Sequence, residues 1–278
     1  MQLCKHWLIR SNGRGLCGAT AVTACAGMTL AWHHNVNVLL VHMKQKGQSV
    51  EALFPSSIMP MAVADEPLKI PNGWRSLLRL YEHRQLDAEL FVSCAVQVMN
   101  RLDIIPGFEG GDNRLRIDLM SKVMETAGKC YDIVLWDVDE QDAAAAEIHN
   151  ANGGSGFAGT IIVLPQVRRL LEEVFRMRQM NASAYVLGMY DAAARLNSAN
   201  VKRQYKLSEP LFTMPYSAAY RNAADEKRLL AWFMHLSMQH KRGKRSLFMA
   251  EQQRLARFIM DESGFHRQSG AKGREMPG

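Results

Sequence analysis

Several features that would narrow the function of this chain are scarce or absent. The five cysteines are scattered, odd in number and never in CxxC spacing. That pattern argues against a disulfide framework and a zinc site, and it favours a reducing compartment. Neither an HExxH nor a GxSxG motif occurs. The sequence therefore gives no support to the common metallohydrolase and serine-hydrolase classes.

Long apolar runs are also missing. No apolar stretch approaches the length that crosses a bilayer, and the amino terminus lacks the charged-then-apolar pattern of a signal peptide. We therefore expect a cytoplasmic protein without a transmembrane segment. The net charge of +7 is moderate. It permits an anionic partner such as DNA, a nucleotide or lipid headgroups, but does not require one.

Short apolar runs alternate with helical patterns along most of the 278 residues. The runs that predict buried strands are residues 6–9, 36–43, 102–107, 131–138, 159–165, 184–190 and 210–215. Between them the spacing predicts helices at 19–33, 73–83, 87–99, 113–128, 166–180 and 217–238. This alternation predicts a single α/β domain with a doubly wound, mostly parallel sheet.

Two segments fall outside the alternation. Residues 44–72 contain four prolines and are predicted to form a long irregular connection. Residues 261–278 are polar and contain glycine, which predicts a flexible tail. We therefore expect the domain to occupy residues 1–260.

The first predicted strand leads into a turn of small residues. HWLIRS (6–11) supplies the strand, GRGLCG (13–18) the turn, and ATAVTACAGMTLA (19–31) the helix. In this context the backbone amides of the turn and the positive end of the helix together form an anion site. The alternative is a tight turn that only starts a helix.

This loop resembles that of the MinD/ParA family of deviant Walker-A ATPases, which have the P-loop NTPase fold. The family loop, KGGxGKT followed by Thr or Ser, aligns with residues 14–21. The positions that match are Gly15, Gly18 and Thr20. Arg14 replaces the signature lysine, Ala19 replaces the phosphate-binding lysine, and Ala21 ends the motif.

The resemblance covers most of the chain. VNVLLVHMKQKG (36–47) is similar to the second strand of the family, and YDIVLWDV (131–138) to the strand that ends in the Walker-B aspartate, here Asp137. AYVLGMYDAAARLNSANVKRQY (184–205) is similar to a strand and helix of the family that include a base-recognising asparagine, and Gly188 stands in the position of that asparagine. FTMPYS resembles the segment whose proline region, here Pro215, lies beside the adenine.

The resemblance implies a site for ATP or ADP with Mg²⁺, with Thr20 and Asp137 on the side of the metal. The implied nucleotide contacts are Arg14, Gly15, Gly18, Ala19, Thr20, Ala21, Asp137, Gly188 and Pro215. The family acids that follow the second strand correspond to His42 and Lys44.

The missing charges bear on catalysis. A hydrogen bond to a charged group contributes about 1.5–3 kcal/mol, so loss of the loop lysine should weaken nucleotide binding by about 10- to 100-fold. We do not expect efficient hydrolysis, because phosphoryl transfer depends on charge placed around phosphate and metal. We assign no catalytic residue. Either a weak nucleotide site is retained, or the fold persists with an empty one.

For function, the resemblance implies a degenerate MinD/ParA-like positioning or assembly factor. The branch that fits best is the pilus or secretion type, similar to TadZ and CpaE, which would act with protein partners and could form a homodimer. The alternative is an ATP-dependent DNA-partitioning ATPase of the ParA type. Such an ATPase must cycle, and cycling needs the chemistry of the missing lysine.

Two surface segments leave further alternatives open. HKRGKR (240–245) is the densest basic cluster, and Lys241, Arg242, Lys244 and Arg245 could bind DNA non-specifically or form a solvated turn. The pattern over 246–260 predicts an amphipathic helix. It could lie on a membrane, as the C-terminal helix does in MinD-like members, or pack on its own sheet, which we favour. We expect a cytoplasmic chain. If the basic cluster binds DNA or the helix binds a membrane, the chain would also make peripheral contact with the nucleoid or that membrane.

Overall fold

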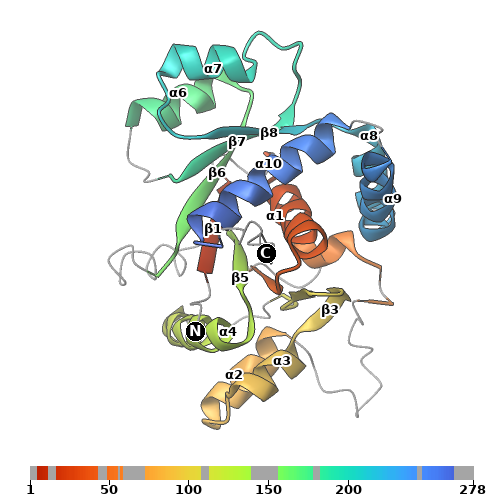
Figure 1. Ribbon diagram of the computed structural model, residues 1–278. Coiled ribbons are helices and arrows are strands. Elements are labelled where there is room, and N and C mark those ends of the chain that lie inside the picture. The colour runs from red at the N-terminus through yellow and green to blue at the C-terminus, as the bar shows by residue number, and fades with distance from the viewer. Residues whose placement is uncertain are drawn as a thin grey trace, which may run out of the picture.

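The described part of the chain forms one mixed sheet covered by helices on both faces. The computed structural model describes residues 5–11, 17–42, 49–55, 57–58, 73–107, 113–138, 156–177, 182–242 and 246–265. Within them, eight strands lie in the order β3-β4-β2-β5-β1-β6-β7-β8 (Figure 1). Their bounds are β1 Lys5–Ser11, β2 Val38–His42, β3 Val96–Met99, β4 Leu102–Ile104, β5 Ile133–Val138, β6 Gly159–Pro165, β7 Ala184–Tyr190 and β8 Leu211–Pro215.

The helices follow the strands in chain order. They are α1 Ala19–Thr29, which continues into a π-helical turn η1 Leu30–His34, then a 3₁₀ turn η2 Val50–Leu53, α2 Trp74–Glu82, α3 Ala88–Cys94, α4 Asn113–Cys130, α6 Arg168–Met177, α7 Ser198–Tyr205, α8 Ala218–Asp225, α9 Leu229–Lys241 and α10 Leu247–Glu262. None of these helices is both long enough and apolar enough to span a membrane.

The sheet confirms the predicted α/β architecture. Every pair of neighbouring strands is parallel except the β3–β4 pair. All six residues of β5 are buried, and so are all five of β2. A parallel strand buried on both faces reads as a continuous apolar run, and this is why these segments could be recognised in the sequence.

Helix α1 lies at the centre of one face of the sheet. Nine of its eleven residues are buried, most of them small. A Cβ added at Gly27 would lie 2.7 Å from a methyl group of Leu40, so the absence of a side chain there lets α1 approach β2 closely. The hydroxyls of Thr23 and Thr29 donate to carbonyls one turn back, which satisfies polar groups that would otherwise be buried without partners.

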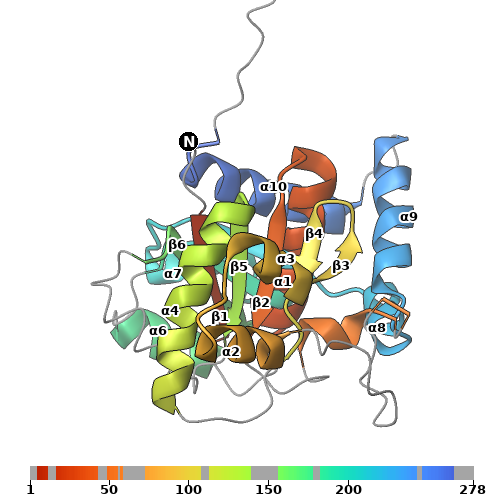
Figure 2. The same cartoon turned by 90° about the horizontal axis from the view of Figure 1, so that it is seen from below.

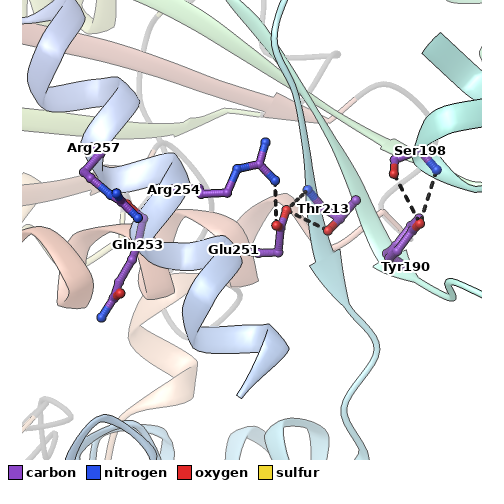
Figure 3. A network of polar contacts seen from close by, with 7 residues as sticks. All are labelled: Tyr190, Ser198, Thr213, Glu251, Gln253, Arg254 and Arg257. Carbon is purple, nitrogen blue, oxygen red and sulfur yellow. Dashed lines mark hydrogen bonds and ion pairs between the residues drawn. The ribbon is translucent and has the colours of Figure 1, made fainter. Parts of the chain in front are cut away.

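Helix α10 packs across α1 and β8 on the same face (Figure 1). Its buried Glu251 accepts hydrogen bonds from the amide and hydroxyl of Thr213 on β8, at 3.1 and 2.8 Å, and an ion pair joins it to Arg254 (Figure 3). At the far end, Trp7 Nε1 donates to Ser263 at 2.9 Å. Most of the apolar residues of α10 are therefore covered by their own domain, as we favoured, and Leu247 in its first turn is exposed.

The opposite face is covered in two halves. Helices α2, α3 and α4 lie over the half that contains β2 and β5 (Figure 2), where Trp74, Phe91 and Trp136 share one apolar cluster. Helices α6 and α7 cover β6 and β7 through a second cluster that includes Leu171, Leu187 and Val201. The doubly wound arrangement leaves the carboxyl ends of the parallel strands along one edge.

Three predicted elements need correction. Residues 87–99 do not form one helix, because α3 ends at Cys94 and the alternating VQVM segment becomes β3, antiparallel to β4. Residues 217–238 form two helices, separated at Glu226–Arg228, where Lys227 takes a left-handed backbone conformation. Helix α10 continues to Glu262, slightly beyond the predicted end at residue 260, and residues 266–278 lie outside the described residues.

The buried His6 on β1 predicts a dependence of stability on pH. Burial lowers its pKa from 6.5 to about 4, and Trp136 Nε1 donates to its Nδ1 at 3.1 Å, which requires that nitrogen to be unprotonated. As the pH falls from about 6.5 to about 4, His6 binds a proton in the unfolded chain but stays neutral in the folded chain. The folded state therefore loses stability over this range. Between pH 7 and 4, urea unfolding should show a loss in the wild type that exceeds the loss in His6→Gln by about 3 kcal/mol. Equal losses in the two proteins would contradict this assignment.

Candidate functional site

The candidate site lies at the carboxyl edge of the sheet, where α1 begins. Asp137 on β5 is in register with His42 on β2 and with Ile9 on β1. The start of α1 is tied to the same place, since α1 contacts β1, β2, β5 and β6. In a doubly wound sheet this is the edge at which ligands bind.

Thr20 and Asp137, far apart in the sequence, are in direct contact. Thr20 Oγ1 donates to Asp137 Oδ2 at 2.8 Å, and Ser49 Oγ donates to the same oxygen at 2.8 Å. The Asp137 side chain is completely buried. Hydrogen bonds to a buried carboxylate are stronger than neutral ones, so the two hydroxyls hold the first turn of α1 and the segment before η2 against β5.

The rest of the loop is described only in part. Arg14 and Gly15 lie outside the described residues. Gly18 precedes α1 with φ +80°, a left-handed conformation that favours glycine. Ala19, in the position of the phosphate-binding lysine, is buried in the apolar core beside α1, and Ala21 packs against that core. The amides of the first turn of α1 remain the groups that could face an anion.

At the end of β2 the site holds a histidine in place of an acid. His42 is fully buried, and its Nε2 lies 3.9 Å from Glu51 Oε2. The same Glu51 oxygen accepts a hydrogen bond from the amide of Gly107 at 2.9 Å, and Trp74 Nε1 donates to the His42 carbonyl at 2.8 Å. These contacts bring η2, the end of β4 and the start of α2 together around β2. Lys44, the other residue aligned with a family acid, lies outside the described residues.

Gly188 on β7 is in contact with the loop itself. An ideal Cβ at this position would lie 1.7 Å from the carbonyl oxygen of Cys17, well inside van der Waals contact. A larger side chain cannot occupy this position unless the backbone at Cys17 moves. The glycine therefore has a steric explanation, and its predicted contact with a base stays a prediction.

Two exposed apolar side chains lie near the ends of β7 and β8. Pro215 is in register with Tyr190, and the amide of Tyr216 donates to the Tyr190 carbonyl at 2.9 Å. Tyr216 and Met189 are each about half exposed, and Met189 has a left-handed backbone with φ +49°. An exposed aromatic ring beside Pro215 is a surface on which a planar base can stack.

The predicted basic cluster follows α9. Lys241 is the last residue of α9, and Arg242 caps the helix and is exposed. Lys244 and Arg245 lie outside the described residues. These two residues lie at the end of α9, which contacts α8 and α10, whereas the residues of the site described above belong to other elements.

Sequence reasoning missed Ser49 and Glu51. Both lie in the segment that was predicted as an irregular connection, yet they contact Asp137 and His42. The only local signal was the serine before the short VEAL run, which forms η2. Their role depends on the path of the chain after β2, which spacing alone does not reveal.

The donor chemistry at the site fits Mg²⁺. The ion prefers oxygen ligands, and a loop hydroxyl with a strand-end carboxylate is the pair that holds it in P-loop NTPases. Thr20 and Asp137 offer that pair. Among the described residues there is no group of three or more His, Cys, Asp or Glu side chains arranged to bind a metal.

Comparison with solved structures places this geometry in a known fold. A ParA family ATPase from Chlorobium tepidum TLS aligns with a TM-score of 0.65 and 13% identity, covering 91% of this chain and 98% of that one. The septum site-determining protein MinD from Pyrococcus horikoshii OT3, complexed with Mg-ADP, aligns with a TM-score of 0.61 and 14% identity, covering 94% and 98%. This chain has the ParA/MinD fold.

A third similar structure shares the ParA/MinD fold. It is a putative plasmid partition protein from Borrelia burgdorferi B31 bound to AMPPNP, with a TM-score of 0.58, 14% identity, and coverage of 85% of this chain and 99% of that one. A scan against protein-family models finds no match, and neither does a sequence search of curated proteins. The ParA/MinD fold is thus visible in three dimensions at a sequence identity too low for those searches.

The contact between Gly188 and the loop predicts a large cost for a single added methyl group. Gly188→Ala should destabilise the protein by about 3 kcal/mol, because the methyl group would displace the backbone at Cys17. The matched control is Gly264→Ala, where an added Cβ meets nothing within 4 Å and only the left-handed backbone is strained, at about 1 kcal/mol. Urea unfolding measures both values. Equal losses for the two variants would show that the loop does not press on β7.

Proposed function

We propose that this chain is a degenerate member of the ParA/MinD group that acts as a positioning or assembly factor of the pilus or secretion type. In this proposal it binds adenine nucleotide with Mg²⁺ weakly, or not at all, and does not hydrolyse it efficiently. The observation that carries the proposal is the replacement of charge by packing at the carboxyl edge. Ala19 is buried in the core where a lysine is expected, and the buried His42 stands where an acid is expected.

The retained groups support weak binding. Thr20 and Asp137 keep the hydroxyl–carboxylate pair, and the uncapped first turn of α1 points its amides toward the same edge. If Mg²⁺ is bound, it supplies positive charge to the phosphates, and Thr20 and Asp137 would be its protein ligands. A nucleotide at this edge would have its base near Pro215 and the exposed ring of Tyr216.

The proposed role needs partners rather than turnover. A protein whose surface is recognised by other components of an assembly can function without hydrolysis, whereas a partitioning protein must cycle between states. We propose that the chain works through such protein partners and can form a homodimer. Its place in the cell would be the cytoplasmic side of the membrane or the nucleoid surface, reached through those partners.

Titration with nucleotide tests the site. Calorimetry with ATP or ADP and Mg²⁺ should give a Kd of about 100 µM or higher, and Thr20→Val should abolish the remaining signal because it removes the hydroxyl that faces Asp137. Thr23→Val is the matched control, since its hydroxyl bonds only within α1, to the Ala19 carbonyl. Low-micromolar binding with sustained phosphate release in the wild type would contradict the degenerate assignment.

The second candidate is an ATP-dependent DNA-partitioning ATPase of the ParA type. The similarity to a plasmid partition protein bound to AMPPNP and the exposed Arg242 beside Lys241 favour it. Under this alternative, duplex DNA should stimulate phosphate release, and Arg242→Glu should abolish the stimulation. Under the assembly proposal, phosphate release stays undetectable with or without DNA, and a malachite-green assay distinguishes the two.

A further inference from the structure

Helix α9 is rich in apolar residues although it lies at the edge of the molecule. Leu229 and Phe233 reach the core, and apolar side chains on its other sides pack beside them, namely Leu230, Trp232, Met234 and Leu236. Yet α9 lies at an edge of the molecule in both views, with α8 and α10 as its neighbours (Figures 1 and 2). A helix that is apolar around most of its circumference is normally covered on all sides.

The exposed side of α9 has the spacing of a helix-pairing seam. Its exposed residues are Arg228, Ala231, His235, Met238 and Arg242, which are separated alternately by three and four positions. This alternation places all five on one face of the helix, as in the seam of a coiled coil. Met238 is 48% exposed, which is large for an apolar side chain on that face.

A groove lies directly beside this seam. It has a volume of about 390 Å³ and runs between α8 and the first turns of α9, with a lining that includes Ala219, Ala223, Glu226, Arg228, Trp232 and His235. The small side chains of Ala219 and Ala223 would allow the backbone of a bound helix to approach α8. The Trp232 ring forms an apolar wall of the groove. Arg228 and His235 belong to both the groove and the seam, and Arg228 is paired with Glu226 at the rim. The concave wall and the seam therefore form one continuous surface.

The charge of this surface indicates what fits it. Among the described residues of the seam, Arg228 and Arg242 are cationic and none is acidic, and the one acidic residue that lines the groove, Glu226, is paired with Arg228. On the seam, cationic or titratable groups alternate with Ala231 and Met238. A complementary helix would place apolar side chains over Ala231 and Met238 and acidic side chains opposite positions 228, 235 and 242.

We propose that the groove between α8 and α9, together with the exposed seam of α9, is a docking site for an acidic amphipathic helix of a protein partner. A flat bilayer does not enter a concave groove, and the exposed apolar residues of the seam are an alanine and a methionine rather than the bulky anchors of an interfacial helix. Duplex DNA would use the cations but leave Met238 without a contact. A helix with both acidic and apolar positions uses every exposed residue of the seam.

A selection experiment tests the chemistry of the occupant. A displayed library of helical peptides of about 18 residues, long enough to cover α9, is selected on the full-length protein and counter-selected on Met238→Glu. Enriched peptides should carry Asp or Glu at seven-residue spacing with apolar residues between them. In fluorescence anisotropy the strongest of these peptides should bind Met238→Glu at least about 10-fold more weakly than the wild type. Val92→Glu, an equally exposed apolar position on α3, should bind it like the wild type.

The other outcomes overturn the proposal. If the peptides selected on the wild type bind Met238→Glu equally tightly, the seam does not select such a helix. The same conclusion follows if the selected peptides carry no acidic pattern. A DNA duplex of about 24 base pairs and vesicles of phosphatidylglycerol are tested in parallel. If either binds the wild type and loses that binding in Met238→Glu, the surface serves DNA or lipid instead. Matching melting temperatures for the two glutamate variants and the wild type ensure that losses of binding are not losses of folding.

Discussion

The buried carboxylate of Asp137 is the group on which the geometry of the carboxyl edge depends. Burying an ionised carboxylate is costly unless hydrogen-bond donors replace the lost water. Here two donors come from different segments, Thr20 from the start of α1 and Ser49 from the chain after β2. One oxygen thus joins three parts of the chain. The Thr20–Asp137 pair has a structural role whether or not a metal binds, so its presence does not by itself require nucleotide hydrolysis.

Around that carboxylate, charged groups expected from the resemblance have been replaced by groups that pack. Ala19 belongs to the core, and His42 is enclosed beside Glu51 by the ends of β2 and β4. The loop rests on Gly188 at a distance that admits no side chain. These contacts leave little space beside Cys17 and Ala19, which is consistent with the proposed weak nucleotide binding. The apolar core lies between the parallel sheet and the helices on both of its faces.

Helices α9 and α10, away from the carboxyl edge, differ in how their apolar residues are covered. Helix α10 is fastened to β8 by Glu251 and Thr213 and to β1 by Trp7, so its apolar side is satisfied within the domain. Helix α9 is different, because its core-facing side is packed while Ala231 and Met238 remain exposed on the other side. Its exposed seam, on which Arg228, His235 and Arg242 alternate with Ala231 and Met238, supports the proposal that the chain acts by recognising a protein partner.

The sequence alone indicated one α/β domain with a doubly wound, mostly parallel sheet. Continuous apolar runs such as those of β2 and β5 are typical of parallel strands covered on both faces, and the glycine turn before α1 indicated the edge of the sheet at which a ligand would bind. It failed for residues 87–99 and 217–238, where helical spacing continued through a hairpin strand and a left-handed Lys227. Only the tertiary structure decided that Ser49 meets Asp137, that Cys17 lies on Gly188 and that α9 has an uncovered face. Each of these depends on where segments distant in the sequence come to rest, and local periodicity carries no information about such contacts.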